Sequence, residues 1–238
     1  MLPVLYTVVL FLFSLPGGNE ASNLAVRMET RYRNATTLQA TFLERYAENG
    51  AVLRAEAGTA YFRRPGKMRW EYDRPEKDLF LVDGKPAWFY VPADHTVTRV
   101  PAKQSDDLRT PLALLAGRMK ISRICSRVEF AEHENLLREG DAILRCVVRG
   151  QPKNTANVSS ADNGFGNDAA DAIFFEVVRQ TGELARIIVR QAGGIQVEFR
   201  FENWRFDPPI PESMFHFEPP PGVAIVNGEL PDEKTQGN

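Results

Sequence analysis

The sequence has almost no excess of charge of either sign. Its 238 residues include 29 Lys and Arg against 31 Asp and Glu, a formal net charge of −2. Nucleic acids and anionic membranes attract proteins through a general positive potential, so we expect no nucleic-acid partner. Hydrophobic residues make up 43% of the chain and charged residues 25%, a balance typical of a globular protein. This composition excludes a disordered chain, a coiled coil and a polytopic membrane protein.

Cysteine and histidine are scarce. Cys125 and Cys146 are the only cysteines, too few for a Cys-rich zinc module or for a scaffold held by several disulfides. The three histidines, His95, His133 and His216, lie far apart, and none has H-x-x-x-H spacing. We therefore expect no metal site and no cofactor.

The short motifs of common enzyme classes are also missing. The sequence contains no G-x-S-x-G elbow and no P-loop, and Gly164 and Gly166 lie in a polar segment rather than between a strand and a helix. The paired acids Asp106 and Asp107 fit the charge preference of a helix N-terminus. We expect no catalytic residues and predict that the protein is not an enzyme, although a triad assembled from distant residues would leave no such motif.

An uncharged apolar run occupies residues 2–15 and ends at a Pro-Gly-Gly sequence. It is shorter than the ~20 residues of a spanning helix but fits the core of a secretory signal; the alternative is a buried core segment. We predict a signal peptide over about 1–18, cleaved near residues 17–21, and a single mature domain over 19–238. No cysteine follows the run, so we expect a soluble exported protein rather than a lipid-anchored one.

Segments with β-strand patterning fill most of the chain after residue 34. Alternation of apolar and polar residues is clearest over 195–206, where it is typical of a half-buried strand. Asn-Gly at 49–50 and Asp-Gly at 83–84 indicate hairpins. The expected strands are 41–48, 52–63, 68–72, 78–82, 87–91, 96–100, 121–130, 142–149, 173–179, 184–191 and 195–206.

Helices are too few to cover both faces of such a sheet. We expect one over 21–33, where apolar residues recur every four positions, and a second over 106–117. About eleven antiparallel strands in a meander tend to curl and close. The sequence therefore predicts a mainly β (α+β) fold, an incomplete and strongly curved antiparallel barrel with short helices over its opening. A flexible loop is expected over 151–171, which is rich in Asn, Asp, Ser, Gly and Ala.

Most of the 24 aromatic residues fall on the expected strands. Each ring taken alone is explained by ordinary core packing. As a set, the rings also fit a second interpretation, because a barrel with this number of strands can leave an interior space for an apolar ligand. An aromatic and aliphatic lining offers contact area without demanding specific hydrogen bonds.

Two adjacent arginines precede a Pro-Gly turn. We expect one of Arg63 and Arg64 to be exposed. The other can reach backbone carbonyls of a covering helix, because a guanidinium keeps its charge and offers several donors in a fixed geometry.

The two cysteines fall on neighbouring expected strands. The register in which Phe130 faces Asp141 also places Cys125 opposite Cys146, and directly opposed residues can be bridged. We therefore predict a structural disulfide that stabilises the fold by ~3 kcal/mol through chain entropy. The alternative is a pair of small buried hydrophobes.

Four segments resemble motifs of the periplasmic outer-membrane lipoprotein carrier family, LolA. Residues 62–72 read FRRPGKMRWEY, similar to the family's R-P-x-x-x-x-W. Residues 83–92 read DGKPAWFYVP, similar to its D-G-x-x-x-W-x-Y-x-P. Residues 215–223 read FHFEPPPGV, similar to its F-x-F-x-P-P-x-G-V. Residues 110–115, TPLALL, match its T-P-x-x-L helix start.

The resemblance implies an incomplete barrel whose apolar cavity is lidded by helices. It implies a periplasmic carrier, a monomer, that binds the acyl chains of lipoproteins released by an inner-membrane ABC transporter and delivers them to an outer-membrane acceptor. In the family, the arginine of the R-P motif hydrogen-bonds the lid closed, and by position this is Arg64. Met68 stands where many members carry an aromatic involved in docking. The residues expected to line the acyl-chain cavity are Met68, Trp70, Tyr72, Phe80, Val82, Trp88, Tyr90, Leu112, Leu115, Val197, Phe199 and Phe201.

Two other functions stay open from the sequence. One is a periplasmic lipid-sensing or regulatory module on the same half-barrel fold. The other is a lipid hydrolase with a triad that leaves no motif. Co-purifying lipoprotein, free lipid or turnover of an ester substrate would distinguish the three.

Overall fold

The computed structural model describes residues 17–83, 86–100, 112, 114–117, 120–149 and 172–228. Twelve strands in this part of the chain form one sheet, in the order β12-β6-β5-β4-β3-β2-β1-β11-β10-β9-β8-β7. The strands are β1 (Thr37–Glu48), β2 (Ala51–Arg63), β3 (Lys67–Arg74), β4 (Leu79–Val82), β5 (Ala87–Val91), β6 (Thr96–Val100), β7 (Cys125–Phe130), β8 (Asp141–Val148), β9 (Ala172–Val178), β10 (Leu184–Gln191), β11 (Ile195–Phe206) and β12 (Ala224–Asn227). The helical elements are α1 (Gly17–Arg33), η1 (Pro92–Asp94), α3 (Ile121–Ile124) and η2 (Glu212–Phe215).

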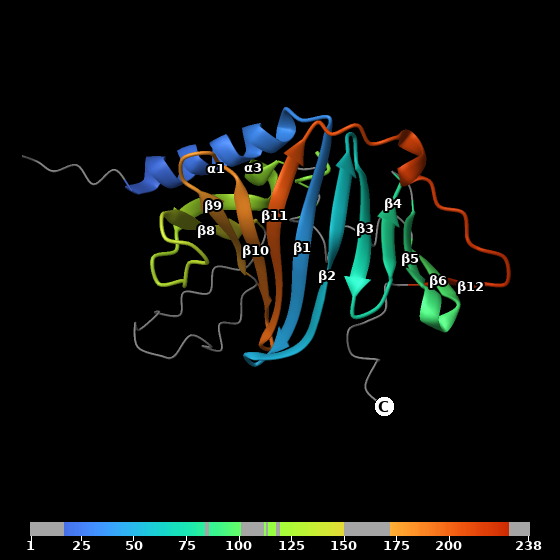
Figure 1. Ribbon diagram of the computed structural model, residues 1–238. Coiled ribbons are helices and arrows are strands. Elements are labelled where there is room, and N and C mark those ends of the chain that lie inside the picture. The colour runs from blue at the N-terminus through green and yellow to red at the C-terminus, as the bar shows by residue number, and fades with distance from the viewer. Residues whose placement is uncertain are drawn as a thin grey trace, which may run out of the picture.

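The chain enters the sheet at its middle. From β1 it runs outward through β2 to β6, reappears at the other edge as β7, and returns through β8 to β11, which pairs with the far side of β1. All these neighbours are antiparallel, whereas β12 joins the edge strand β6 in parallel. The sheet curls, and α1 lies across its upper end (Figure 1). The prediction of a mainly β, strongly curved and incompletely closed sheet is confirmed.

The long central hairpin follows from its turn residues. Asn49 and Gly50 both have positive φ, 47° and 83°, as a tight turn between twisted antiparallel strands requires. The turn between β10 and β11 lies beside it, because the Asn49 N–H donates to the carbonyl of Gly194 at 2.8 Å. Strands β1 and β2 can therefore extend for 12 and 13 residues and form the centre of the sheet.

Helix α1 covers one face of the sheet with an apolar stripe. Its buried residues are Ala21, Leu24, Ala25, Met28 and Tyr32, spaced three or four apart as one helical face requires. They belong to one buried cluster with side chains from most strands. We call the sheet face in this cluster the inner face and the opposite one the outer face.

Two expectations about elements were wrong. Residues 121–124, expected to begin a strand, form the helical turn α3, and strand β7 begins only at Cys125. Strand β12 was not expected, because its four residues carry little pattern and all are exposed. The expected helix over 21–33 is present and extends back to Gly17.

Some predictions lie outside the described residues. They are the apolar run of the predicted signal peptide, the start of the expected 106–117 helix and the 151–171 loop. Of that helix, the structure describes Leu112 and a turn over 114–117.

Candidate functional site

The inner face carries a cluster of aromatic rings centred on Trp70. This residue is fully buried. Its ring centroid lies 4.7 Å from that of Phe42, 5.7 Å from that of Phe62 and 5.6 Å from that of Phe199. All three contacts are edge to face, a geometry that favours aromatic pairs beyond their burial alone. Strands β1, β2, β3 and β11 thus build one continuous aromatic surface.

Most of the expected lining residues meet on this surface. Those in the buried cluster are Met68, Trp70, Tyr72, Phe80, Val82, Leu112, Leu115, Phe199 and Phe201. Val197 is partly buried and packs against it. In the structure these side chains pack together in one buried cluster.

Trp88 and Tyr90 lie elsewhere, which corrects their expected place in the lining. On β5 the residues that join the inner-face cluster are Ala87 and Phe89. Trp88 and Tyr90 instead pack on Phe217, with ring centroids 5.7 and 5.8 Å away. Successive strand residues point to opposite faces, so the two sets cannot share one face.

Sequence reasoning missed Phe89, although a signal for it was present. Val82 pairs with Ala87 and Phe80 with Phe89 across a four-residue connection. Any even-numbered connection, including a two-residue Asp-Gly turn, places Phe89 on the face of Phe80. Two further inner-face rings, Phe42 and Phe62, follow from the same alternation on β1 and β2.

The cover of the inner face consists of α1 together with Leu112 and the turn 114–117. Leu112, Leu114, Leu115 and Ala116 are at most 2% exposed. The turn is joined to the sheet by a hydrogen bond from the Gly66 N–H to the carbonyl of Ala116, at 2.9 Å. The part of the cover formed by Leu112 and the turn 114–117 is therefore held to the sheet mainly by buried apolar side chains.

Arg64 joins the parts of this cover. Its Nη2 donates to the carbonyl of Tyr32 near the end of α1, at 2.6 Å. Its side chain also passes against Gly117, where a Cβ would lie 2.1 Å from Nη1. Gly117 has φ +74°, so both its conformation and this close approach require glycine. Burial, followed by the positive charge of Arg33, lowers the pKa of Arg64.

Tyr32 fixes the C-terminal half of α1. It is fully buried, its ring centroid lies 4.9 Å from that of Trp204, and its hydroxyl accepts a hydrogen bond from the Leu184 N–H at 2.8 Å. Burial raises the pKa of Tyr32 well above its ordinary value. The adjacent Arg31 pairs with Glu183 at 3.2 Å. This half of the helix is held by polar as well as apolar contacts.

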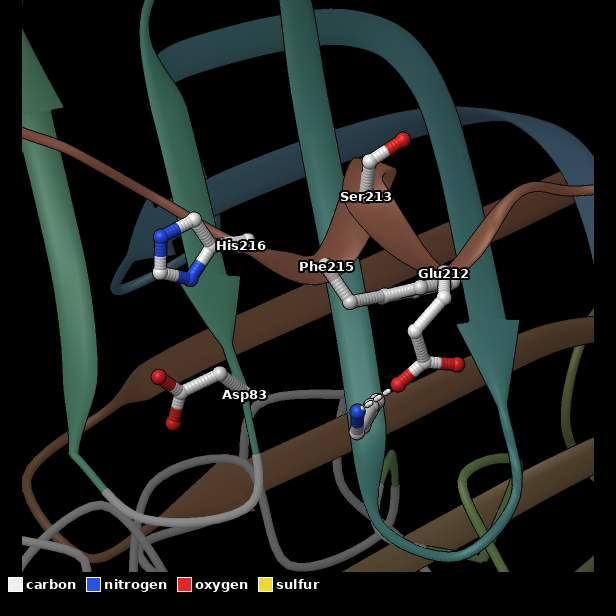
Figure 2. A pocket seen from close by; sticks show the side chains of 6 residues that line it. Asp83, Glu212, Ser213, Phe215 and His216 are labelled. Atoms are coloured by element: carbon white, nitrogen blue, oxygen red, sulfur yellow. Dashed lines mark hydrogen bonds and ion pairs between the residues drawn. The ribbon is translucent and has the colours of Figure 1, made fainter.

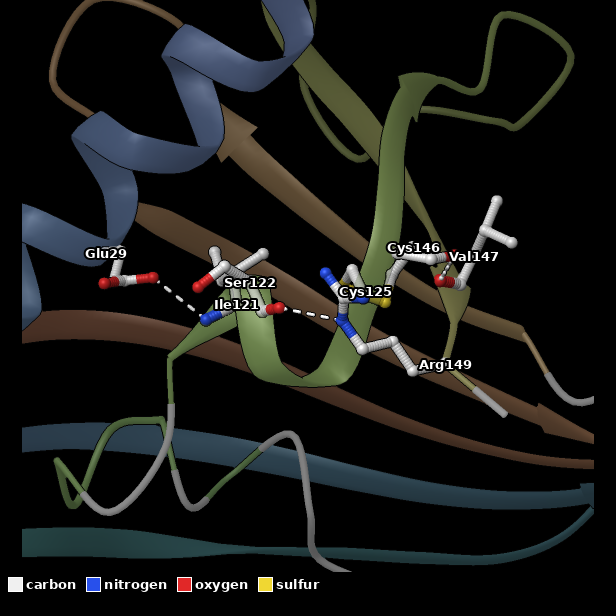
Figure 3. The surroundings of a disulfide bond; sticks show 8 residues. Glu29, Ile121, Ser122, Cys125, Cys146, Val147 and Arg149 are labelled. Atoms are coloured by element: carbon white, nitrogen blue, oxygen red, sulfur yellow. Dashed lines mark hydrogen bonds between the residues drawn. A yellow bond between two sulfur atoms is a disulfide. The ribbon is translucent and has the colours of Figure 1, made fainter. Parts of the chain in front are cut away.

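Cys125 and Cys146 are bonded, with their Cα atoms 5.3 Å apart (Figure 3). The expected register was wrong: Cys125 pairs with Val148, and Cys146 pairs with Val128. An irregularity in β7 directly after Cys125 lets the two cysteines meet diagonally rather than face to face. The disulfide thus ties the start of β7 to its neighbour β8.

The helical turn α3 lies directly before Cys125 in the sequence and contacts helix α1 of the cover. Glu29 of α1 accepts a hydrogen bond from the Ile121 N–H at 2.9 Å, and Arg149 donates to the carbonyl of Ser122 at 2.9 Å (Figure 3). The chain leaving the cover is therefore fixed both to α1 and to the sheet edge.

The outer face over β3 to β5 is covered by residues 208–223, which we call the strap. Arg63 donates to the carbonyl of Ile210 at 2.9 Å, and Arg69 to that of Met214 at 3.0 Å. Glu212 pairs with both Arg63 and Lys67. A pocket beside η2 is lined by Lys67, Asp83, Glu212, Ser213, Phe215 and His216 (Figure 2). Five of these six residues are polar or charged.

Within the described residues, no three His, Cys, Asp or Glu side chains gather closely enough to hold a metal ion. Among the helices that the structure describes, none is long and apolar enough to cross a membrane.

Two protein families match the chain. The family described as outer membrane lipoprotein carrier protein LolA matches residues 33–137. A family described as predicted periplasmic protein (DUF2092) matches residues 184–227.

Individual proteins resemble the chain over most of its length. An outer-membrane lipoprotein carrier protein of Nitrosomonas europaea is 30% identical over 234 residues, which cover 95% of this chain and 99% of the relative. One from Chromobacterium violaceum is 30% identical over 196 residues, covering 81% and 82%. Among solved structures, an uncharacterized conserved protein from Thermus thermophilus has a TM-score of 0.52 at 14% identity, covering 87% of this chain and 99% of that one. This last similarity is one of fold alone.

Proposed function

Because the chain belongs to the outer-membrane lipoprotein carrier family, LolA, we propose that it binds the acyl chains of lipoproteins on its inner face and carries them from the inner to the outer membrane. The observation that carries this proposal is the continuous apolar surface beneath the cover, which includes Trp70, Phe199 and Phe201.

Acyl chains need such a surface to cross an aqueous compartment. Each methylene exposed to water costs about 0.8 kcal/mol, so one long chain costs on the order of 10 kcal/mol. A lining of rings and aliphatic side chains removes this cost without requiring one fixed pose. The apolar inner face of this sheet supplies the chemistry that an acylated protein requires.

Release requires that the cover compete with the cargo. The apolar side chains of the cover occupy the inner face in the closed state, so a bound acyl chain must displace them. Opening costs the free energy of the closed contacts, which lowers the net affinity for cargo. Arg64 contributes to these contacts through Tyr32 and Gly117, and we propose that it latches the cover.

We further propose a periplasmic location, reached through a signal peptide over about residues 1–18. The matches to LolA and to a periplasmic family support this location. The proposed partners are acylated lipoproteins, an inner-membrane ABC transporter that supplies them and an outer-membrane acceptor. The family is one of carriers, and we propose no catalytic role.

The proposal is tested by purifying the chain from the periplasm of its source bacterium and identifying bound molecules by mass spectrometry. We expect acylated lipoproteins to co-purify. Free lipid without lipoprotein would contradict the carrier function and favour a lipid-sensing module, and protein free of any acylated molecule would contradict both.

A matched pair of variants places the binding on the covered face. Phe199 is 3% exposed on the inner face of β11, whereas Leu136 is 46% exposed. We expect Phe199→Glu to lose most bound lipoprotein and Leu136→Glu to retain it, with folding of both checked by circular dichroism. Equal retention by the two variants would contradict binding under the cover.

A further inference from the structure

A buried carboxylate interrupts the apolar inner face at one level of the sheet. Along β1, Ala40 and Phe42 belong to the buried apolar cluster, and the next residue on the same face is Glu44. On β2, Ala60 belongs to the cluster, and Glu56 lies four residues away on the same face. The polar level crosses two adjacent strands, and apolar side chains resume beyond it, where Tyr46 pairs with Val197.

Glu44 is buried at this level. It is 6% exposed, and its Oε2 accepts a hydrogen bond from the hydroxyl of Tyr72 at 2.8 Å. The Tyr72 ring in turn lies edge to face against Phe42, with centroids 5.1 Å apart. Across the sheet, Glu44 faces Phe199 on β11. The carboxylate therefore adjoins the aromatic surface directly.

This arrangement does not serve hydrocarbon binding. A buried carboxylate loses its hydration unless donors replace it, and Glu44 also faces Glu56 across the β1–β2 pair. Like charges in facing positions destabilise a sheet, although Arg54 lies 3.2 Å from Glu56 and offsets part of this repulsion. An aliphatic residue at position 44 would extend the apolar surface at lower cost.

A ligand with N–H donors beside its acyl chain gains from such a group, because charge-assisted hydrogen bonds to a carboxylate are strong. We propose that Glu44, held by Tyr72, lies within the acyl-binding part of the inner face and accepts a hydrogen bond from an amide N–H next to the acyl chain of the cargo. Glu44 is then a specificity-determining residue that favours amide-linked over ester-linked chains. This inference rests on the proposed carrier function.

The test uses two synthetic ligands of equal chain length. One is an N-palmitoylated pentapeptide, and the other is its ester analogue, in which oxygen replaces the acylated N–H. Isothermal titration of the wild-type protein should show about tenfold tighter binding of the amide, the size expected for one hydrogen bond to a charged group. Glu44→Leu should bind the ester at least as well as wild type and lose the preference.

Two further variants separate this role from a structural one. Glu44→Gln retains an acceptor oxygen and should keep part of the preference. Tyr72→Phe should reduce the preference, whereas Tyr61→Phe, at an outer-face position of β2, should not.

The possible results of these titrations separate the role of Glu44 from the proposed carrier function. A wild type without preference, or a preference that Glu44→Leu leaves intact, overturns the role of Glu44 while the carrier function stands. A folded Glu44→Leu that loses affinity for both ligands equally overturns it as well. Failure of wild type to bind either ligand overturns the proposed function and this inference together.

Discussion

The two coverings of the sheet differ in their share of polar contacts. The cover of the inner face adheres mainly through buried apolar side chains such as Met28, Leu112 and Leu115. The strap on the outer face also buries apolar side chains, among them Phe215, but it adds the contacts of Arg63 with Ile210 and Glu212. Directed polar contacts therefore form a larger part of what holds the strap.

This difference separates an exchangeable covering from a permanent one. An acyl chain can replace apolar contacts of the cover, because burial of hydrocarbon is non-directional. It cannot replace ion pairs or hydrogen bonds to carbonyls. Salt weakens exposed ion pairs, so we expect salt to loosen the strap before it affects the cover.

The largest loss of stability is expected for a substitution at Tyr32, which fixes α1 to the sheet. Tyr32→Ala removes a fully buried ring that packs on Trp204 and leaves the Leu184 N–H without its hydroxyl acceptor. We expect a loss of about 3–5 kcal/mol in the free energy of unfolding, measured by urea denaturation. The control Val26→Ala, on the exposed side of α1, should change it by less than about 0.5 kcal/mol. Similar small values for both would contradict the anchoring of α1.

The next largest loss of stability is expected when the disulfide is removed. Replacing Cys125 and Cys146 by alanine should lower the free energy of unfolding by ~3 kcal/mol, because the bond closes a loop with a sequence separation of 21. Hydrogen exchange at the start of β7 should accelerate in the same variant, since the bond fixes this edge strand. Unchanged denaturation midpoints with and without reductant would refute a structural role.

A smaller effect is expected for the polar latch of the cover. Arg64→Leu removes the donor to the Tyr32 carbonyl and should weaken the closed state by about 1–2 kcal/mol, the range for a hydrogen bond from a charged group at a partly exposed site. Amide exchange at Ala116 and Gly117 should accelerate, and release of cargo to the acceptor should slow.

Arg63→Leu is the matched control for the latch. Its side chain contacts the strap rather than the cover, so exchange at Gly117 should stay as in wild type. Equal exchange at Gly117 in the two variants, or unchanged cargo transfer by Arg64→Leu, would count against the latch.

The smallest effect concerns the strap and pH. A hydrogen bond from Lys67, reinforced by the positive charges of Lys67 and Arg63, lowers the pKa of Glu212. Its contribution to stability is therefore present above the unfolded-state pKa of about 4.3 and is lost as pH falls through the lower folded-state pKa. Glu212→Gln should melt slightly below wild type at pH 7, and the two melting temperatures should converge in acid. A gap that widens in acid would contradict the assigned partners.

Sequence patterning predicted elements more reliably than contacts between them. Alternation and turn pairs predicted most strands, because these signals are local. The expected face of Trp88 and Tyr90 was wrong, because the pairing of β4 with β5 places Phe89, not its two neighbours, on the face of Phe80. The disulfide register was mistaken because the irregularity after Cys125 leaves no local signal. The partner carbonyl of Arg64 depends on how α1 docks, a tertiary result that local patterning does not contain.

The central claim is that cargo hydrocarbon contacts the inner face and not the outer one. Phe89 and Trp88 are adjacent residues on opposite faces of β5, so each can carry the photo-crosslinking residue benzoylphenylalanine in turn. Irradiation of periplasmic protein should crosslink acylated lipoprotein to position 89 and not to position 88. Crosslinking of equal strength at both positions, or at position 88 alone, would contradict the account.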